Sequence, residues 1–234
     1  MKSTIQDKDK LVNSVFSEVH KKYDLMNDLM SLGVHRIWKE KFINWMNPQP
    51  NTQLVDVASG TGDIAKLFHF RTNKSSNITC IEPNNEMFRK GKDKLKKFEN
   101  ITWINTVAEK IPIEDNTFDY YSISFGLRNV SNINQALKEA FRILKPGGRF
   151  MCLEFSKVEN EILDYLYKQY SKAIPYVGKL VVGSDKPYKY LVESIKKFHN
   201  QQELAKFISN NGFSNVEFRN LSNGISAIHS GWKI

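Results

Sequence analysis

The chain has 234 residues, which suits one α/β domain with a small elaboration. Hydrophobic residues make up 41% and charged residues 25%, as in an ordinary soluble domain, and no apolar run approaches the ~20 residues that span a bilayer. The net charge of +9 comes from dispersed lysines and arginines, which argues against nucleic acid and leaves an anionic membrane surface as a partner. The polar residues 1–10 do not resemble a secretory signal.

The two cysteines, Cys80 and Cys152, both lie in short apolar runs typical of strands. We expect buried thiols in a reducing compartment rather than a disulfide. No Cys/His spacing resembles a zinc motif, so no metal site is predicted.

Short β-branched runs alternate with amphipathic stretches from about Gln53 onward. This alternation predicts β-α units on a Rossmann-like, mostly parallel seven-stranded sheet with helices on both faces. The strands are expected at Gln53–Val57, Ile78–Ile81, Ile101–Asn105, Tyr120–Ser124, Arg149–Glu154, Val216–Arg219 and Gly224–Ile228, and the helices near Asp63–Phe70, Glu86–Phe98 and Asn134–Leu144.

Two regions of the single domain, residues 1–234, fall outside this pattern. Leu11–Met46 predicts two helices, which form an N-terminal helical cap within residues 1–50. Asp164–Ile208 predicts helix interrupted at Pro175, Gly178, Gly183 and Pro187, and residues 156–200 form a helical substrate-cover insertion before the last two strands. The segment Lys145–Gly148 is expected to stop a helix and open a strand.

The first expected strand runs straight into the loop Ala58–Asp63, which contains Gly60, Thr61 and Gly62. Glycine lets a backbone turn sharply and approach a ligand, and the N-terminus of the following helix favours an anionic group. The pattern fits the pyrophosphate of a nicotinamide cofactor and the carboxylate of S-adenosylmethionine (AdoMet) equally. The loop alone therefore leaves these two cofactors open.

Two later positions favour AdoMet. Glu82 ends the second strand twenty positions after Gly62, where an acid accepts hydrogen bonds from ribose hydroxyls. Val107 and Ala108 precede Glu109 after the third strand, and their size suits an adenine lying against the backbone.

The fourth strand ends in the turn Ser124–Asn129, at the sheet edge where open α/β sheets bind ligands. Arg128 and Asn129 place a cation and an amide near the reactive end of the cofactor. The alternative for Arg128 is a surface salt bridge.

These segments resemble the ubiquinone/menaquinone biosynthesis C-methyltransferase family over nearly the whole chain, from about Val12 to Lys233. The most restrictive matches are the two N-terminal motifs and the turn after the fourth strand. The matching segments are Lys22–Asp28, Gly33–Lys39, Asp56–Asp63, Phe125–Val130, Leu144–Arg149, Leu153–Ser156, Tyr190–Ile195 and Ala227–Gly231.

The resemblance implies AdoMet-dependent methylation of a ring carbon of a polyprenylated benzoquinol or naphthoquinol. It carries AdoMet contacts onto Thr61, Glu82, Val107, Ala108 and Ser124, beside the loop glycines. The chain departs from the family at Glu82, where Asp is usual, at Ser59, where Gly is common, and at His199, where Pro is usual. Its last four residues look closer to mitochondrial members, which implies a peripheral protein on the matrix side of the mitochondrial inner membrane. The alternative is the bacterial cytoplasm at the inner membrane.

For catalysis we expect Arg128 to stabilise a phenolate and Asn129 to position the ring, because an arginine stays charged and is a poor base. Tyr23 is the third catalytic candidate, near the sulfonium or the quinol oxygen. His35 fits either a proton acceptor or a packed residue. The apolar stretch Ile162–Val182 fits either a channel for the polyprenyl tail or ordinary helix packing.

Other functions stay open. A non-catalytic AdoMet-fold scaffold of a quinone-biosynthesis complex would bind AdoMet without turnover. A methyltransferase acting on RNA or a small phenol, and a nicotinamide oxidoreductase, are further alternatives. A homodimer and a quinone-biosynthesis protein complex are the remaining partner expectations.

Overall fold

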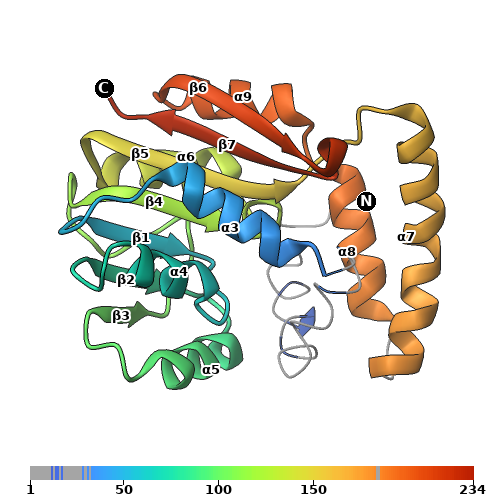
Figure 1. Ribbon diagram of the computed structural model, residues 1–234, viewed down its shortest axis with the longest axis horizontal. Coiled ribbons are helices and arrows are strands. Elements are labelled where there is room, and N and C mark those ends of the chain that lie inside the picture. Colours follow the sequence, from blue (N-terminus) through green and yellow to red (C-terminus); the bar gives the residue numbers. More distant parts are fainter. Residues whose placement is uncertain are drawn as a thin grey trace.

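We describe the chain from a computed structural model, which covers Val12, Ser14, Val15, Ser17, Asp28, Ser31 and residues 33–182 and 185–234. One seven-stranded sheet forms the centre of the molecule, in the order β3-β2-β1-β4-β5-β7-β6 (Figure 1). The first five strands pair in parallel and β7 is antiparallel to its neighbours, so the mostly parallel sheet expected from the sequence is confirmed. The strands are β1 Gln53–Val57, β2 Asn77–Ile81, β3 Ile101–Ile104, β4 Phe118–Ser124, β5 Leu144–Phe155, β6 Ser214–Leu221 and β7 Ser226–Trp232.

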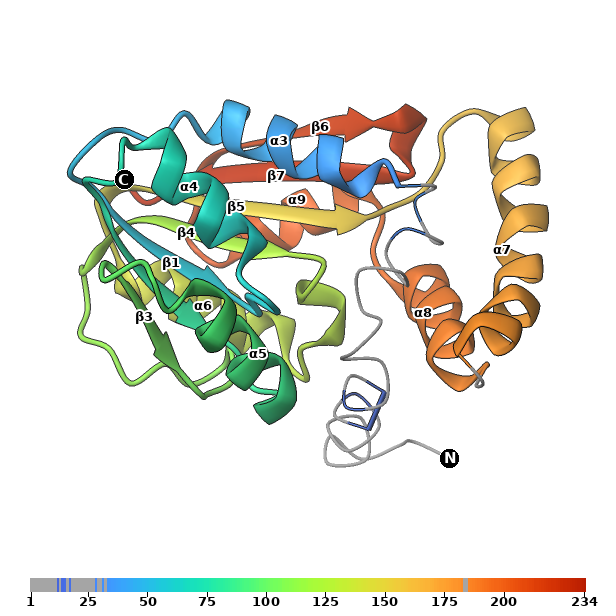
Figure 2. The same ribbon diagram turned by 60° about the horizontal axis from the view of Figure 1, so that its bottom comes forward.

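Helices cover both faces of the sheet, as predicted (Figures 1 and 2). One face packs against α3, α4 and α5 through a core that includes Phe42, Phe68 and Leu95. The other face packs against α6 and α9 through a second core that includes Leu137 and Ile208. The helices are α3 His35–Met46, α4 Asp63–Arg71, α5 Asn85–Leu95, α6 Ile133–Ile143, α7 Glu161–Val182, α8 Lys186–Lys197 and α9 Gln201–Asn210.

The central strands are apolar on both sides because each face is covered. Leu54 of β1 lies in one core and Val55 lies in the other, and both are fully buried. Near-continuous apolar runs of this kind are typical of parallel strands between two helical layers. Both cysteines are buried and free, as expected.

The segment Lys145–Gly148 differs from its prediction. It lies inside β5, which begins directly after α6, and the pairing of β4 with β5 shifts register between Phe118 and Tyr120. Gly147 adopts a φ of +81°, which glycine tolerates. The glycines therefore form an irregularity within one long strand rather than its boundary.

The insertion also differs from its prediction. Helix α7 continues through Pro175 and Gly178, which were expected to interrupt it. Pro187 stands in the first turn of α8, where the missing N–H has no helical partner to lose. Figure 1 shows α7 and α8 side by side at the end of the sheet, and contacts between the two helices agree. Of the two helices expected before β1, α3 is described, and the first lies largely outside the described residues.

Candidate functional site

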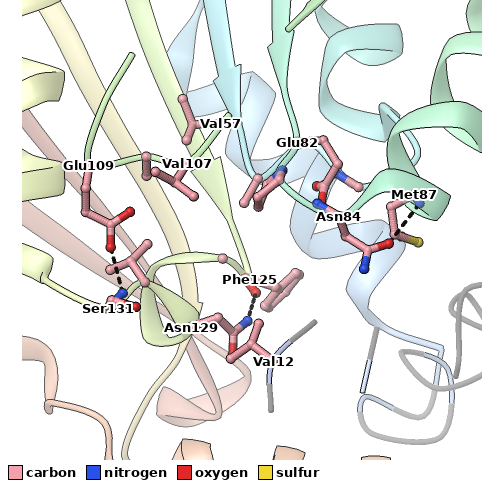
Figure 3. Close-up of a pocket in the computed structure, with 16 residues that line it drawn as sticks. Val12, Val57, Glu82, Asn84, Met87, Val107, Glu109, Phe125, Asn129 and Ser131 are labelled. Atoms are coloured by element: carbon pink, nitrogen blue, oxygen red, sulfur yellow. Dashed lines mark hydrogen bonds between the residues drawn. The ribbon is translucent and has the colours of Figure 1, made fainter. Parts of the chain in front are cut away.

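A cavity of about 290 Å³ lies at the carboxyl ends of β1, β2 and β4. The strand order reverses between β1 and β4, and α/β sheets bind their ligands at this switch point. Figure 3 shows Glu82 and Asn84 on one side of the cavity, Val107 and Glu109 on the opposite side, and Phe125 and Asn129 below. The lining residues are Val12, Val57, Ala58, Gly60, Glu82, Pro83, Asn84, Met87, Val107, Ala108, Glu109, Phe125, Gly126, Asn129, Val130 and Ser131.

The backbone at the floor of this cavity is left-handed at several positions. Gly60 and Gly62 have φ values of +58° and +80°, and the non-glycine residues Ala58 and Phe125 have +51° and +56°. Such conformations are uncommon for residues with a Cβ and concentrate at functional sites. At Gly62 a Cβ would lie 2.4 Å from Leu95 Cδ1, so a side chain there would displace the end of Leu95 in addition to straining the backbone. The glycine loop is therefore shaped for close approach to a ligand.

The Glu82 carboxylate joins the glycine loop to the end of β2. Its Oε2 accepts the Gly60 N–H at 2.8 Å and its Oε1 accepts the Asn84 N–H at 2.9 Å. Burial raises the pKa of Glu82 to about 7, although both N–H groups favour the charged form. Each carboxylate oxygen keeps a lone pair beyond its one backbone partner, so Glu82 has acceptors to offer to ribose hydroxyls.

A slot with apolar walls lies beyond Glu82. Met87, Val107 and Ala108 supply its side chains. Asn84 holds one wall by capping α5, because its Oδ1 accepts the Met87 N–H at 3.1 Å. Glu109 holds the other wall, since its Oε1 accepts the Ser131 N–H at 2.7 Å (Figure 3). Val107 and Ala108 thus lie on the cavity, and their contact with adenine stays a prediction.

A smaller, polar cavity of about 20 Å³ adjoins the loop, and Thr61, Ser124 and Asp56 are among its lining residues. Asp56 Oδ1 accepts the Ser122 hydroxyl at 2.7 Å, whereas Asp56 Oδ2 and Ser124 Oγ are buried without a partner among the described residues. Burial raises the pKa of Asp56 to about 7 against the effect of Ser122. A buried polar atom without a partner is costly, so these two atoms mark a place for a bound donor.

Two lysines surround Asp63 at the start of α4. Lys39 Nζ from α3 lies 2.8 Å from Asp63 Oδ2, and Lys94 Nζ from α5 lies 2.7 Å from Asp63 Oδ1. Burial alone would raise the pKa of Asp63, but the two lysines outweigh it and lower the pKa. Asp63 thus fastens the cap helix α3 to the glycine loop.

The turn after β4 places Asn129 and Arg128 differently. Asn129 lines the main cavity. Arg128 lines neither this cavity nor the smaller one; its Nη1 donates to Glu154 Oε1 at 2.7 Å and to the Phe125 carbonyl at 2.6 Å. Both side chains of the Arg128–Glu154 pair are almost fully buried, so the pair is not the surface salt bridge considered from the sequence.

The predicted site residues thus fall into groups. Five lie on the main cavity: Gly60, Glu82, Val107, Ala108 and Asn129. Thr61 and Ser124 lie on the smaller cavity, and Gly62 begins α4 beside them. Arg128 belongs to the turn, but its buried side chain pairs with Glu154 and lines neither cavity. Tyr23 lies outside the described residues.

His35 is buried on α3, and its Nε2 lies 3.0 Å from Asp28 Oδ1. Burial lowers the pKa of His35, and the nearby Lys39 lowers it further. His35 lines none of the described cavities, which matches the packed role considered from the sequence.

Sequence reasoning missed Asp56, Lys39 and Glu154. Asp56 is the single acid of β1 and Glu154 is the single acid of β5, and each stands among buried apolar residues. An unexplained acid in a buried apolar run is a signal that identifies both. Lys39 gave no such signal, because it belongs to a helix that carries several other charges.

The residues present fit AdoMet. Glu82 would meet the ribose hydroxyls, the Met87–Ala108 slot would hold the adenine, and the unpartnered oxygens of Asp56 and Ser124 would meet the methionine ammonium group. Among the described residues, no cluster of three or more His, Cys, Asp or Glu side chains is arranged to hold a metal ion.

The comparisons with solved structures agree with this fold. A SAM-dependent methyltransferase from Thermotoga maritima superposes with a TM-score of 0.67 at 19% identity, covering 94% of this chain and 99% of that one. A SAM-dependent methyltransferase from Aquifex aeolicus gives 0.61 at 16% identity, covering 84% and 89%. These likenesses show the methyltransferase fold.

Sequence relatives are much nearer. The chain is 47% identical to the ubiquinone/menaquinone biosynthesis C-methyltransferase UbiE of Brucella abortus (strain S19), over 97% of this chain and 87% of the relative. It is 48% identical to the protein of the same name from Brucella anthropi, over 97% and 89%. The model of the ubiE/COQ5 methyltransferase family matches residues 3–233. The chain therefore belongs to the ubiE/COQ5 methyltransferase family and is an AdoMet-dependent C-methyltransferase, as its sequence predicted.

Proposed function

We propose that the protein methylates a ring carbon of a polyprenylated quinol in ubiquinone biosynthesis, as a 2-methoxy-6-polyprenyl-1,4-benzoquinol methylase. The observation that most supports methylation of a quinol is the amide of Asn129, which lies below Glu82 and Val107 on the cavity wall (Figure 3), where the reactive end of the cofactor would meet an acceptor. The names of the relatives support quinone biosynthesis and cover both ubiquinone and menaquinone. A demethylmenaquinol is therefore the alternative substrate.

AdoMet, when bound, supplies an electrophilic methyl group on a sulfonium. The ring must be electron-rich to attack it, so the substrate is the reduced quinol, and ionising a phenol of pKa ~10 increases its nucleophilicity. Asn129 would donate a hydrogen bond to the developing phenolate. Arg128, whose charge is balanced by Glu154, would hold the turn that carries Asn129 rather than supply a free positive charge. Tyr23 would lie near the sulfonium or the quinol oxygen.

The Arg128 role has a direct test. Arg128→Lys and Arg128→Ala are measured at saturating AdoMet with a reduced short-tail quinol. We expect both to lose much more than a few-fold in kcat, because each disturbs the guanidinium that bonds Phe125 and Glu154. If kcat survives within a few-fold in both variants, Arg128 has no role in the chemistry.

The ring and the position of methylation have their own test. Quinones are extracted from cells that lack this protein and identified by mass spectrometry. An accumulated demethylated benzoquinone supports the ubiquinone assignment, whereas a demethylated naphthoquinone replaces it with the menaquinone one. If neither demethylated intermediate accumulates, this result contradicts the proposed function and favours the non-catalytic scaffold.

A lipid-tailed substrate also suits a protein that works at a membrane surface. None of the helices in the described ranges is long and apolar enough to cross a bilayer. The outer side of α7 exposes Ile162, Tyr165 and Leu166, at 72%, 62% and 56%, whereas Ile174 of the same helix is buried in the core. Of the two roles considered for this stretch, ordinary helix packing applies to Ile174. We propose that the exposed residues near the start of α7 contact the lipid phase.

Peripheral binding predicts attraction to anionic lipid, because the net charge is +9. Sedimentation with vesicles of increasing anionic lipid content tests this attraction. Binding that does not change with anionic lipid content or with salt concentration would contradict it. The bacterial relatives give no support to the mitochondrial location expected from the chain end and agree with the bacterial alternative. A homodimer and a quinone-biosynthesis complex remain proposals for its protein partners.

A further inference from the structure

Tyr190 of α8 reaches across to the turn that follows β4. Its hydroxyl donates to Asn129 Oδ1 at 2.9 Å, which joins two residues 61 positions apart. Asn129 lines the cavity, whereas Tyr190 belongs to the segment Tyr190–Ile195, a matching motif to which no function has been attached so far. The contact therefore links the helical insertion to a side chain of the site.

The two neighbours of the Asn129 amide agree on one orientation. The Tyr190 hydroxyl can donate or accept, so it suits either end of the amide, and in the structure it donates to the amide oxygen. The Phe125 carbonyl can only accept, and it faces Asn129 Nδ2 at 3.4 Å (Figure 3). The flipped amide would set its oxygen against the carbonyl oxygen of Phe125, which repels it. The Phe125 carbonyl thus decides which end of the amide is the donor, and the Tyr190 hydroxyl holds the oxygen end in place.

This orientation decides what the cavity offers. Asn129 Oδ1 is engaged by Tyr190, and Nδ2 carries a second hydrogen that has no acceptor in the described part of the chain. The amide therefore presents a donor, and a donor stabilises a phenolate whereas an acceptor would destabilise it.

We infer that Tyr190 is a positioning residue that holds the Asn129 amide with its N–H toward the ring oxygen of the methyl acceptor. This inference rests on the proposed function. Tyr190 acts through Asn129 and stays outside the reacting atoms.

Packing alone gives no reason for the Tyr190 hydroxyl. Helix α8 is fixed by Tyr188, Leu191 and Ile195, which are buried, whereas Tyr190 is only partly buried. The Tyr188 hydroxyl, two residues away, is buried without a partner among the described residues, so the helix packs without a hydrogen bond from that position. Tyr188→Phe is therefore a matched control, because it removes a hydroxyl from the same helix and leaves Asn129 alone.

The test is a double-mutant cycle on kcat, with Tyr190→Phe, Asn129→Ala and the double variant. The substrates are short-tail benzoquinol and naphthoquinol acceptors kept reduced, and the product is measured by mass spectrometry at saturating AdoMet. We expect Tyr190→Phe to lower kcat about 2- to 10-fold, the usual worth of one hydrogen bond. Asn129→Ala loses more, roughly 100-fold, because it removes the donor itself.

The kcat of the double variant decides whether Tyr190 acts through Asn129. If Tyr190 acts only through Asn129, the double variant has the kcat of Asn129→Ala within about twofold, as expected for coupled residues. A merely structural Tyr190 gives effects that multiply, and this result would overturn the inference. AdoMet affinity by calorimetry should be unchanged in Tyr190→Phe, and Tyr188→Phe should keep the wild-type kcat.

Two failures can be told apart. An active wild-type protein with an unchanged kcat in Tyr190→Phe overturns the role of Tyr190 and leaves the proposed function intact. A wild-type protein that methylates neither ring overturns the proposed function, and the inference with it.

Discussion

Arg128 Nη1 lies 2.7 Å from Glu154 Oε1, and the two side chains are only 4% and 1% exposed. The same carboxylate accepts the backbone N–H of Arg128 at 3.3 Å and that of Phe155 at 2.9 Å. Glu154 thus ties the turn after β4 to the end of β5. Burial raises the pKa of Glu154, although Arg128 counteracts this. The ion pair therefore holds the turn that carries Asn129.

Arg128→Met should cost about 3–5 kcal/mol of unfolding free energy, because it leaves the Glu154 charge buried and unpaired. Urea denaturation at pH 7.5 measures the loss. The double variant Arg128→Met/Glu154→Gln should recover a large part of it, since the lone charge is gone. A double variant less stable than Arg128→Met would show that Glu154 is needed for its backbone hydrogen bonds rather than for the ion pair.

Glu82→Gln should weaken AdoMet binding by roughly 10- to 100-fold. A glutamine places an NH₂ group against the N–H of either Gly60 or Asn84, so a donor faces a donor at the edge of the cavity. Glu82→Asp keeps the charge but is one methylene shorter, and we expect a loss below about 10-fold. Isothermal titration with AdoMet measures both variants.

The control for Glu82 is Glu86→Gln. Glu86 lies four positions later on α5, with its side chain 43% exposed. The AdoMet affinity of Glu86→Gln should equal that of the wild type. If Glu82→Gln binds AdoMet as tightly as the wild type does, Glu82 does not contribute to AdoMet binding.

Gly126→Ala should reduce AdoMet affinity more than tenfold. A Cβ at Gly126 would lie 2.5 Å from Ala58 Cβ, which has no flexible end to move, so the ends of β1 and β4 must separate where both line the cavity. Gly147→Ala is the matched control. Its φ of +81° makes alanine strained by about 1–2 kcal/mol, but nothing lies within 4 Å of its Cβ.

Both glycine variants should therefore lose thermal stability, and only Gly126→Ala should lose affinity for AdoMet. Calorimetry below the melting temperature of each variant separates the two effects. If Gly147→Ala loses as much affinity as Gly126→Ala, general destabilisation explains both.

The sequence predicted the parallel strands and the residues of the cavity well, because both depend on short-range pattern. The last strand was misplaced, because it runs from Ser226 to Trp232 and not from Gly224 to Ile228. Apolar runs of four to six residues identified the strands, and the positions after those runs identified Gly60, Glu82 and Val107, which the topology brings together. Adjacent carboxyl ends of parallel strands must share one edge, so no knowledge of side-chain contacts was needed.

The partner of Arg128 could not be predicted in the same way. Glu154 stands 26 residues later, and whether an arginine at the sheet edge turns inward depends on which strand lies beside it. The course of α7 through Pro175 was missed for a related reason, because the tertiary contacts of Ile174 stabilise the helix against its local breaker. Long-range packing decided both cases.

Asp56→Asn should stabilise the protein without AdoMet, and the gain should grow with pH. Burial raises the pKa of Asp56 from 3.8 to about 7, so between these values the folded state holds a proton that the unfolded state has lost. The stability that comes from this group is complete below pH 3.8 and is lost as pH rises through about 7, at up to about 1.4 kcal/mol per pH unit. Asparagine does not titrate, so it escapes this loss.

The unfolding free energies of the variant and the wild type must be compared at each pH, because other groups change the stability in the opposite direction as pH rises. Burial lowers the pKa of His229 to about 4, so that histidine makes the folded state more stable as pH rises from about 4 to 6.5. The difference in unfolding free energy between Asp56→Asn and the wild type cancels this term. Urea denaturation from pH 4 to 8 should give a difference that increases to about pH 7 and then levels off.

The control is Asp93→Asn on α5, where the aspartate is 77% exposed and pairs with Lys96 at the surface. That exchange should change the unfolding free energy by less than about 1 kcal/mol at every pH in the range. A gain for Asp56→Asn that is the same at pH 4 and pH 8 would mean that the Asp56 carboxyl does not change its charge in the folded protein over this range. In that case Asp56 would be charged throughout, and its unpartnered Oδ2 would have to find a donor that neutralises the effect of burial.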